Sequence, residues 1–319
     1  MIKHKGRSWL TAIIFIFFSA CAFFIHKGLF SSSRDHSGEE IITPEDRYAI
    51  FPVDMPEELF FAGEEVPVNE PDVMESLDRE LLVNTYWQSQ TLLYIKRANR
   101  YFPVIERILE KNDIPDDFKY LAVAESGLTN AVSPSNACGF WQLLEGTAGD
   151  YGLEINDQVD ERYHLEKATR VACEYLKDSY EKYGSWTMAA ASYNAGRRGI
   201  DRQIKRQGDS DYFDLLLTEE TARYVYRILA YKLILSNPSE YGFYLGEEDL
   251  YHQIPYYELT LEQSVDNFAG FAARYNITYK TLKLLNPWLR DTSLSLKHNK
   301  IYYLKIPREG IFNPNRVDE

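Results

Sequence analysis

A single carboxylate near the end of one predicted helix has the position expected of a general acid. The run "DIPDDFKYLAVAES" (113–126) predicts a helix in which Phe118, Leu121, Ala122 and Glu125 share one face. Glu125 therefore lies on an apolar face and close to the helix C-terminus. Both features raise a carboxyl pKa, because burial disfavours the anion and a helix C-terminus presents partial negative charge. A carboxylic acid that stays protonated near neutral pH suits general acid catalysis.

The same residue has a structural interpretation. A glutamate at the end of a helix commonly points into solvent, and Gly127 ends this helix whatever the role of Glu125. The residues that follow, "LTNAVSPSNACGFWQL" (128–143), are mostly small, polar and turn-forming, and they are more than a helix needs in order to stop. Periodicity alone leaves both interpretations of Glu125 open.

The elements around Glu125 are predicted to be helical. Apolar residues recur at three- and four-residue steps over 81–112, where Pro103 is expected to break or restart the helix. The same pattern predicts helices over 164–183, 186–196 and 219–236. We therefore expect a helical domain over 81–245.

The sequence pattern changes from mainly helical to mixed strand and helix after Pro238. Strand patterns at "YYELTLEQSV" (256–265) and "KIYYLKIP" (300–307) flank two short helical patterns, "DNFAGFAARY" and "TYKTLKLLN". This order predicts a small βααβ domain over 250–310. The expected fold class is α+β, mainly α, with a helical domain followed by this satellite.

Charge is distributed unevenly along the chain. The net charge is -13 and the pI is near 5.1, so nucleic acid is not expected to be a partner. Residues 31–80 hold fifteen Asp or Glu residues against three Arg residues, and their periodicity is weak. This composition predicts an acidic linker over 31–80, with partial order near "FPVDMPEELFF" (51–61) as the exception.

The N-terminus predicts a membrane anchor or signal segment over 1–30. The basic start "KHKGR" precedes "SWLTAIIFIFFSACAFFI" (8–25), an uncharged run long enough to span a bilayer. Basic residues before the run favour an N-inside orientation, which places the rest of the chain across the membrane. An uncleaved anchor is favoured, and lipidation at Cys21 is the alternative.

The other two cysteines leave their state open. Cys138 and Cys173 would pair in an oxidising compartment or remain as two buried thiols. Cys and His residues do not cluster at ligand spacing, so neither a metal nor a cofactor is expected.

Three motifs in a fixed order resemble one enzyme family. "ESGLTNAVSPSNACGFWQ" (125–142), "SYNAG" (192–196) and "EETARYV" (219–225) resemble the motifs of family-one lytic transglycosylases, whose catalytic domain is lysozyme-like. The similarity covers about 100–240. It implies cleavage of the β-1,4 bond between N-acetylmuramic acid and N-acetylglucosamine in peptidoglycan, on the periplasmic side of the bacterial envelope. The muramic 6-hydroxyl replaces water as nucleophile and leaves a 1,6-anhydro end.

The resemblance implies roles for individual residues. Glu125 would be the sole catalytic acid and would then serve as the base towards the 6-hydroxyl. Seven residues would orient the acid or bind substrate: Ser126, Ser133, Gln142, Tyr193, Asn194, Glu220 and Tyr224. Four of them have a structural alternative, as a core aromatic (Tyr193), a helix-start acid (Glu220), a turn residue (Ser133) or an exposed amide (Gln142). Many family members have Met where this chain has Trp141, whose broad ring serves either stacking or packing.

The C-terminal domain resembles a LysM module, a fold that binds N-acetylglucosamine-containing glycans. The resemblance rests on "SVDNFAGFAARYNITYKTLKLLNPWL" (264–289) and "IYYLKIP" (301–307). The usual opening "GDTL" is replaced by "SVDNF", so the module either binds sugar or supports the catalytic domain. For the whole chain, the rival hypotheses are a muramidase that hydrolyses the same bond and a non-catalytic glycan-binding scaffold.

Overall fold

The computed structural model describes residues 51–296 and 300–312. The predicted N-terminal anchor and Cys21 lie outside these ranges. Within them, no helix combines the length and the apolar character needed to cross a membrane.

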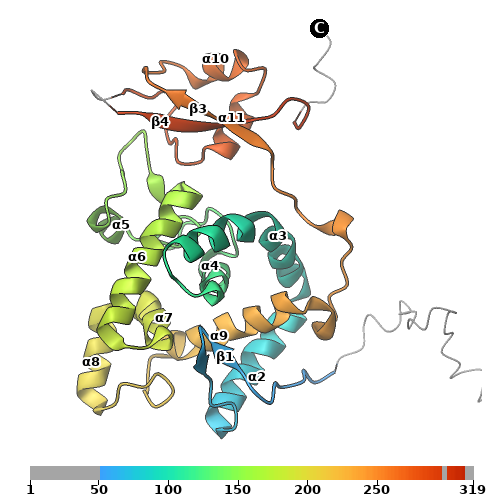
Figure 1. Ribbon diagram of the computed structural model, residues 1–319, viewed down its shortest axis with the longest axis vertical. Helices are drawn as coiled ribbons and strands as arrows, with labels where there is room; N and C mark the ends of the chain where they lie inside the picture. Colours follow the sequence, from blue (N-terminus) through green and yellow to red (C-terminus); the bar gives the residue numbers. More distant parts are fainter. Residues whose placement is uncertain (1–50, 297–299, 313–319) are drawn as a thin grey trace, which may run out of the picture. The chain divides into compact units, whose positions relative to one another are not determined.

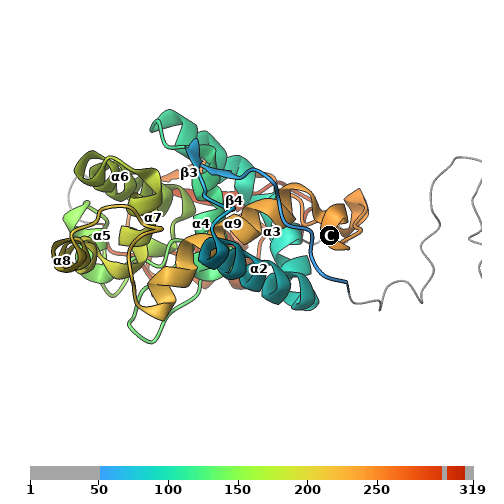
Figure 2. The same cartoon turned by 90° about the horizontal axis from the view of Figure 1, so that it is seen from below.

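The first part of the described chain is helical (Figures 1 and 2). Its α-helices are α2 (Pro71–Tyr86), α3 (Gln88–Lys111), α4 (Lys119–Ser126), α5 (Glu145–Asp150), α6 (Leu165–Tyr183), α7 (Trp186–Ala195), α8 (Arg197–Gln207) and α9 (Glu219–Ser236). Short 3-10 helices cover Asp116–Phe118, Glu161–Tyr163, Pro238–Tyr241 and Glu247–Asp249. The short helix α4 lies in the middle of the bundle, packed against α3 and α9. The helix that bears Glu125 is therefore surrounded by longer ones.

Helix α4 has the apolar face that its sequence predicts. Phe118, Leu121 and Ala122 are fully buried. The helix ends at Gly127, which has a left-handed backbone with φ of 59°. A Cβ atom at Gly127 would lie 2.4 Å from the ring of Tyr94, so both the backbone conformation and the space require glycine.

Pro103 does not break the helix, contrary to expectation. Helix α3 continues through Pro103 to Lys111, and the interruption lies instead at Trp87, between α2 and α3. Proline removes one backbone hydrogen bond from a helix. Ile105 and Leu109, which follow it, are fully buried, and this packing maintains the last turns of α3.

The predicted acidic linker over 31–80 is wrong for its second half. Residues 60–65 form a hairpin of β1 (Phe60–Phe61) and β2 (Glu64–Glu65), and α2 begins at Pro71. Phe61 is buried edge-on against Phe118, with ring centroids 5.3 Å apart, and α2 packs on α9. Apart from the buried Glu80, most charged residues of this segment are exposed, and their number masked the few apolar residues that anchor it. Residues 31–50 lie outside the described ranges.

The β1–β2 hairpin also caps a helix of the candidate site. The Glu64 carboxylate accepts hydrogen bonds from the Ser185 hydroxyl (2.9 Å) and from the Thr187 backbone N–H (2.9 Å) and hydroxyl (2.7 Å). It also accepts one from the backbone N–H of Trp186, the first residue of α7. A carboxylate at a helix N-terminus satisfies unpaired N–H groups and complements the helix dipole. The hairpin thereby holds the start of α7.

The C-terminal part is the predicted βααβ unit. It consists of β3 (Tyr256–Leu261), α10 (Phe268–Ala273), α11 (Tyr279–Leu285) and β4 (Tyr302–Pro307). The two strands are antiparallel, with Tyr256 opposite Pro307 and Leu261 opposite Tyr302. Phe268, Leu282 and Leu304 are fully buried in its core. The expected α+β, mainly α, fold class is confirmed.

Removing the Glu64 carboxylate should destabilise the helical domain. We expect Glu64→Ala to lower the free energy of unfolding by about 1–2 kcal/mol, because several N-terminal donors of α7 lose their acceptor. Urea unfolding followed by circular dichroism measures the change. Glu65→Ala is the matched control, because the neighbouring Glu65 is exposed. Equal stability of the two variants would show that Glu64 does not hold α7.

Candidate active site

Three helices bring the central residues of the candidate site together. Glu125 comes from α4, Tyr193 from α7 and Tyr224 from α9. The Tyr224 hydroxyl donates a hydrogen bond to Glu125 Oε1. The negative charge of Glu125 raises the pKa of both tyrosines, after burial, which is the larger cause. The three motifs that are distant in sequence thus meet around one carboxylate.

The pKa of the Glu125 carboxyl is raised to about 7. Burial is the largest cause, since it removes water from around the anion. The hydrogen bond from Tyr224 and the positive charge of Arg227 lower this pKa, and the negative charge of Glu220 raises it. The direction of the shift agrees with the prediction from the apolar face. The raised pKa keeps the Glu125 carboxyl partly protonated near neutral pH.

Arg227 was not predicted as a site residue, and neither was Glu80, which holds Arg227 in place. Glu80 of α2 is 1% exposed, and its carboxylate accepts a hydrogen bond of 2.6 Å from Arg223 Nε. Arg227 Nε lies 3.6 Å from the other oxygen of Glu80. Neither Glu80 nor Arg227 belongs to the motifs that carry the family resemblance, so the sequence offered no signal for this network. This network holds Arg227 in place, and the positive charge of Arg227 limits how far the pKa of Glu125 rises.

Ser126 joins the end of α4 to the loop that follows. Its hydroxyl donates to the Phe140 carbonyl at 2.8 Å and accepts from the Thr129 backbone N–H at 3.3 Å. These contacts are with backbone groups and not with the Glu125 carboxylate. Ser126 therefore positions loop 127–143 relative to the acid.

Ser133 and Gln142 also make backbone contacts within loop 127–143. The Ser133 hydroxyl accepts from the Ala137 N–H at 3.0 Å, which closes a tight turn. Gln142 Nε2 donates to the carbonyls of Ala131 (3.0 Å) and Gly139 (2.8 Å), and its backbone has a φ of 46°. Among the described residues, Gln142 Oε1 has no hydrogen-bond partner. That oxygen is a free acceptor in a fixed orientation.

Tyr193 and Trp141 connect α7 to the same loop. The Tyr193 hydroxyl donates to the Trp141 carbonyl at 2.7 Å. The Trp141 side chain is fully buried, and its Nε1–H donates to the Thr169 hydroxyl at 2.8 Å. Of the two roles open to its ring, the structure shows packing and not stacking on a ligand.

Asn194 and Glu220 link α7 to the start of α9. Asn194 Nδ2 donates to Glu220 Oε1 at 3.4 Å, and the Thr221 hydroxyl donates to Asn194 Oδ1 at 2.9 Å. Glu220 is exposed, so its carboxylate borders the site without being enclosed in it. Of the seven predicted residues, Tyr224 is hydrogen-bonded to Glu125, and Tyr193 and Glu220 lie close enough to interact with it electrostatically. Ser126 and Asn194 contact neighbouring elements, whereas Ser133 and Gln142 are hydrogen-bonded only within loop 127–143.

Arg162 is a further supporting residue that sequence reasoning missed. It is buried, pairs with Asp160 at 2.7 Å, and donates to the carbonyl of Asn136 at 3.0 Å. A Cβ atom at Gly139 would lie 2.1 Å from the Arg162 carbonyl oxygen, so the loop approaches this segment too closely for any other residue.

Cys138 and Cys173 are both buried and free.

Comparison with known protein families identifies the class. Residues 102–216 match the model of the transglycosylase SLT domain. Residues 257–310 match the model of the soluble lytic transglycosylase C-terminal LysM-like domain. The chain therefore contains an SLT domain followed by a LysM-like domain, and the resemblance inferred from the motifs is confirmed.

Two curated relatives bear the same name. Membrane-bound lytic murein transglycosylase D of Escherichia coli strain K12 is 26% identical over 258 residues, which is 78% of this chain and 55% of the relative. The protein of that name from Escherichia coli O6:H1 gives the same values, 26% over 258 residues. The chain thus spans about half the length of the curated relatives it matches.

Burial of Glu125 should make stability depend on pH. The folded-state pKa of about 7 lies above the ordinary value of 4.5 for a glutamate, so the stabilising contribution present at low pH is lost as pH rises through 7. Glu125→Gln has no ionisable group at this position. We expect its free energy of unfolding, relative to the parent, to increase by about 1–3 kcal/mol between about pH 4 and pH 8. Urea unfolding of both proteins across this range measures the difference, and a constant difference would contradict the raised pKa.

Proposed function

We propose that this protein is a peptidoglycan lytic transglycosylase in which Glu125 is the single general acid and base. The observation that supports this most directly is the Glu125 carboxyl. It has a pKa raised to about 7 and a hydrogen bond from Tyr224, within the region that matches the SLT domain. The substrate is the β-1,4 bond between N-acetylmuramic acid and N-acetylglucosamine.

In the first step, Glu125 acts as an acid. Because the Tyr224 hydroxyl donates to Oε1, the acidic proton resides on Oε2 of the protonated carboxyl. That proton passes to the glycosidic oxygen as the bond between this oxygen and the muramic anomeric carbon breaks. The leaving sugar departs as an alcohol, and the anomeric carbon becomes electron-poor.

In the second step, the Glu125 carboxylate acts as a base. It accepts the proton of the muramic 6-hydroxyl while the 6-oxygen bonds to the anomeric carbon, which closes the 1,6-anhydro ring. The nucleophile belongs to the substrate, so proximity replaces a second catalytic carboxylate. The carboxylate that influences the pKa of Glu125 is Glu220, which is exposed and hydrogen-bonded to Asn194.

The remaining predicted residues would shape the groove. We assign Gln142 Oε1 as an acceptor for a sugar N–H or hydroxyl, because Gln142 Nε2 is already committed to two carbonyls. Ser126 and Ser133 maintain the loop, Tyr193 holds the loop to α7, and Asn194 orients Glu220. Tyr224 sets the orientation and the acidity of Glu125.

The domain and envelope assignments belong to the same proposal. Residues 81–245 would form the catalytic domain and 250–310 the glycan-associated module, with 1–30 as the membrane anchor. The relatives' name describes membrane-bound murein enzymes, which supports an envelope location. We place the described part of the chain on the periplasmic side, with peptidoglycan strands as its partner.

The products distinguish a transglycosylase from a muramidase. We expect mass spectrometry of peptidoglycan digested by the purified protein to show muropeptides that lack one water, as 1,6-anhydro ends require. Reducing muramic ends as the main product would instead identify a hydrolase that uses the same acid. Absence of any cleavage, with glycan binding retained, would identify a scaffold.

Glu125→Gln should greatly reduce turnover and retain the fold. Glutamine preserves the acceptor for Tyr224 but has no acidic proton, so we expect cleavage to fall by about 10²–10⁴-fold. Glu145→Gln, at an exposed position in α5, is the matched control and should keep parental activity. Release of soluble muropeptides from sacculi measures both. Parental activity of Glu125→Gln would refute the assignment of the acid.

Tyr224→Phe should move the alkaline side of the pH–rate profile. The hydrogen bond from Tyr224 lowers the pKa of Glu125, so its removal raises that pKa. We expect the alkaline limb of kcat/KM, which reports loss of the acidic proton, to shift upward by about 0.5–1 pH unit. Tyr244→Phe, at an exposed position, should leave the profile unchanged. A downward shift for Tyr224→Phe would contradict the assigned hydrogen bond.

A further inference from the structure

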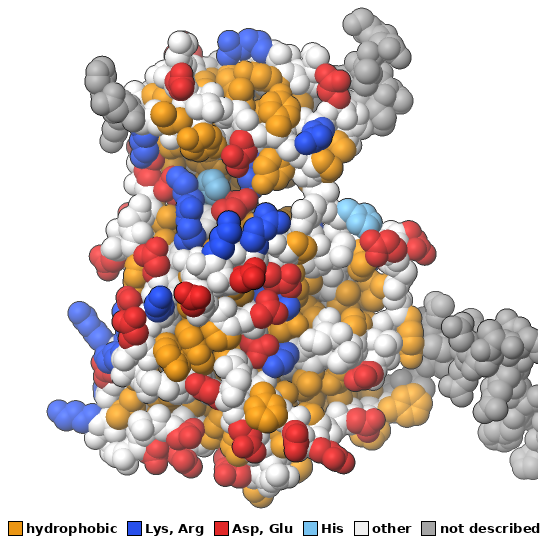
Figure 3. All heavy atoms as spheres, in the orientation of Figure 1, with side chains coloured by type: hydrophobic (Ala, Val, Ile, Leu, Met, Phe, Trp, Pro, Cys, Tyr) orange, Lys and Arg blue, Asp and Glu red, His pale blue; other side chains and the backbone are white. Residues whose placement is uncertain are grey.

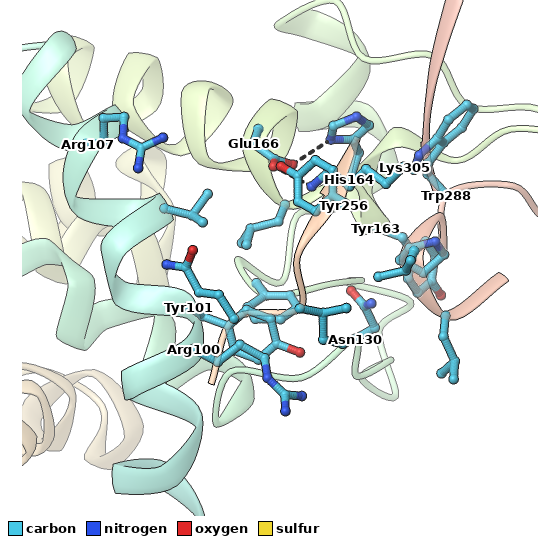
Figure 4. Close-up of a pocket in the computed structure, with 18 residues that line it drawn as sticks. Arg100, Tyr101, Arg107, Asn130, Tyr163, His164, Glu166, Tyr256, Trp288 and Lys305 are labelled. Carbon is cyan, nitrogen blue, oxygen red and sulfur yellow. Dashed lines mark hydrogen bonds and ion pairs between the residues drawn. The ribbon is translucent and has the colours of Figure 1, made fainter. Parts of the chain in front are cut away.

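A pocket that does not include Glu125 lies between the helical domain and the LysM-like domain. Its volume is about 190 Å³, and its walls come from α3, the start of α6 and the βααβ unit. None of the eight predicted site residues lines it. Figure 3 shows basic side chains gathered around a hollow on this face, and Figure 4 shows the pocket from within.

Two arginines of α3 give the pocket its excess positive charge. Arg100 and Arg107 are seven residues apart, so they project from the same side of the helix (Figure 4). Within the described ranges, Arg107 makes no ion pair or hydrogen bond. Arg100 donates through Nε to the His252 carbonyl at 2.8 Å, and its guanidinium lies over the Tyr251 ring at 5.2 Å. Its two terminal nitrogens make no hydrogen bond or ion pair with the described residues. Both guanidinium groups therefore retain donors for a ligand.

The carboxylate in the pocket wall, Glu166, is already neutralised. It forms an ion pair with Lys305 of the LysM-like domain, and His164 Nδ1 lies 3.2 Å from its other oxygen. Burial alone would raise the pKa of Glu166, but the contacts with His164 and Lys305 lower it below the ordinary value. Glu166 is thus a structural anion, and it does not cancel the charge of Arg100 and Arg107.

Aromatic rings form the apolar part of the pocket. Trp288 is stacked between His164, at a centroid distance of 5.8 Å, and Tyr302, at 5.5 Å. Tyr101 of α3 meets Phe140 edge-on at 4.7 Å. These rings are held in place before any ligand arrives, so binding against them costs little ordering of side chains. A ligand with a small apolar portion next to an anionic group fits these walls.

We infer that this pocket binds a carboxylate-bearing peptide segment attached to the peptidoglycan strand. Two arginines with free donors match carboxylates in charge and geometry. The volume is below the roughly 300–1,000 Å³ of sites for drug-sized ligands, which suits a segment of one or two residues. Asn130 and Phe140 line the pocket and belong to loop 127–143, which also contains Gln142. The attachment of the peptide to a strand rests on the proposed function.

Binding of a short acidic peptide tests the pocket directly. The probe is N-acetyl-L-alanyl-D-glutamate, titrated calorimetrically into the detergent-solubilised full chain. Its neutral analogue, in which amides replace both carboxylates, is the chemical control. We expect the acidic peptide to bind at least about tenfold more tightly than the neutral one.

Variants assign the binding to the α3 arginines. Arg107→Gln breaks no described contact, and it should lower the affinity for the acidic peptide at least about fivefold. The double variant, Arg100→Gln with Arg107→Gln, should lower this affinity at least about tenfold. Arg198→Gln is the matched control, because Arg198 is exposed on α8 and away from the pocket. Parental affinity in the Arg107→Gln and double variants, or no binding by the parent, would overturn the inference.

Two further measurements separate this inference from the proposed function. Glu125→Gln should bind the acidic peptide as the parent does. Arg107→Gln should raise KM for peptide-bearing strands at least about threefold and leave KM for amidase-stripped strands unchanged. An equal rise in KM for both strand types would contradict the inference that the bound peptide is attached to the strand. If peptide binding depended on Arg107 but no anhydro products formed, the site would be supported and the proposed reaction rejected.

Discussion

Partial burial of one carboxylate at the centre of the helical domain is the constraint on which the rest of the site depends. Helix α4 is only eight residues long and is surrounded by longer helices, so Glu125 loses water and gains a raised pKa. A partly buried carboxylate without partners would be costly, and the hydrogen bond from Tyr224 and the positive charge of Arg227 reduce that cost. The bundle therefore keeps the acid near the point at which it can both donate and accept a proton.

The support for this acid extends beyond the residues that identify the family. The match to the SLT domain begins at residue 102, whereas Glu64 and Glu80 precede it. Glu80 holds Arg223 and Arg227 on α9, and Glu64 caps α7, the helix of Tyr193. The segment before the matched region is consequently part of the framework that orients the site.

Sequence predicted the features that local pattern determines. The apolar face of α4, the left-handed Gly127 and the βααβ unit follow from periodicity and from glycine's freedom at positive φ. Features that depend on distant contacts were missed. Order in 52–80 comes from packing on α9 and α7, and continuity through Pro103 comes from burial after it. The contacts of Gln142 and Trp141 likewise depend on a loop whose path periodicity does not describe.

The LysM-like domain is joined to the helical domain too closely to act as a free glycan-binding module. The Arg290 N–H donates to the Gln158 carbonyl at 2.8 Å, and Gln158 Oε1 accepts from the Ser295 N–H at 3.0 Å. Val159 is buried in the same apolar cluster as Trp288. Polar groups of residues after α11 are thus hydrogen-bonded to the helical domain, and fewer of them are available to bind a sugar. This packing supports segment 154–166, and it brings Lys305 and Trp288 into the wall of the pocket that Arg100 and Arg107 also line.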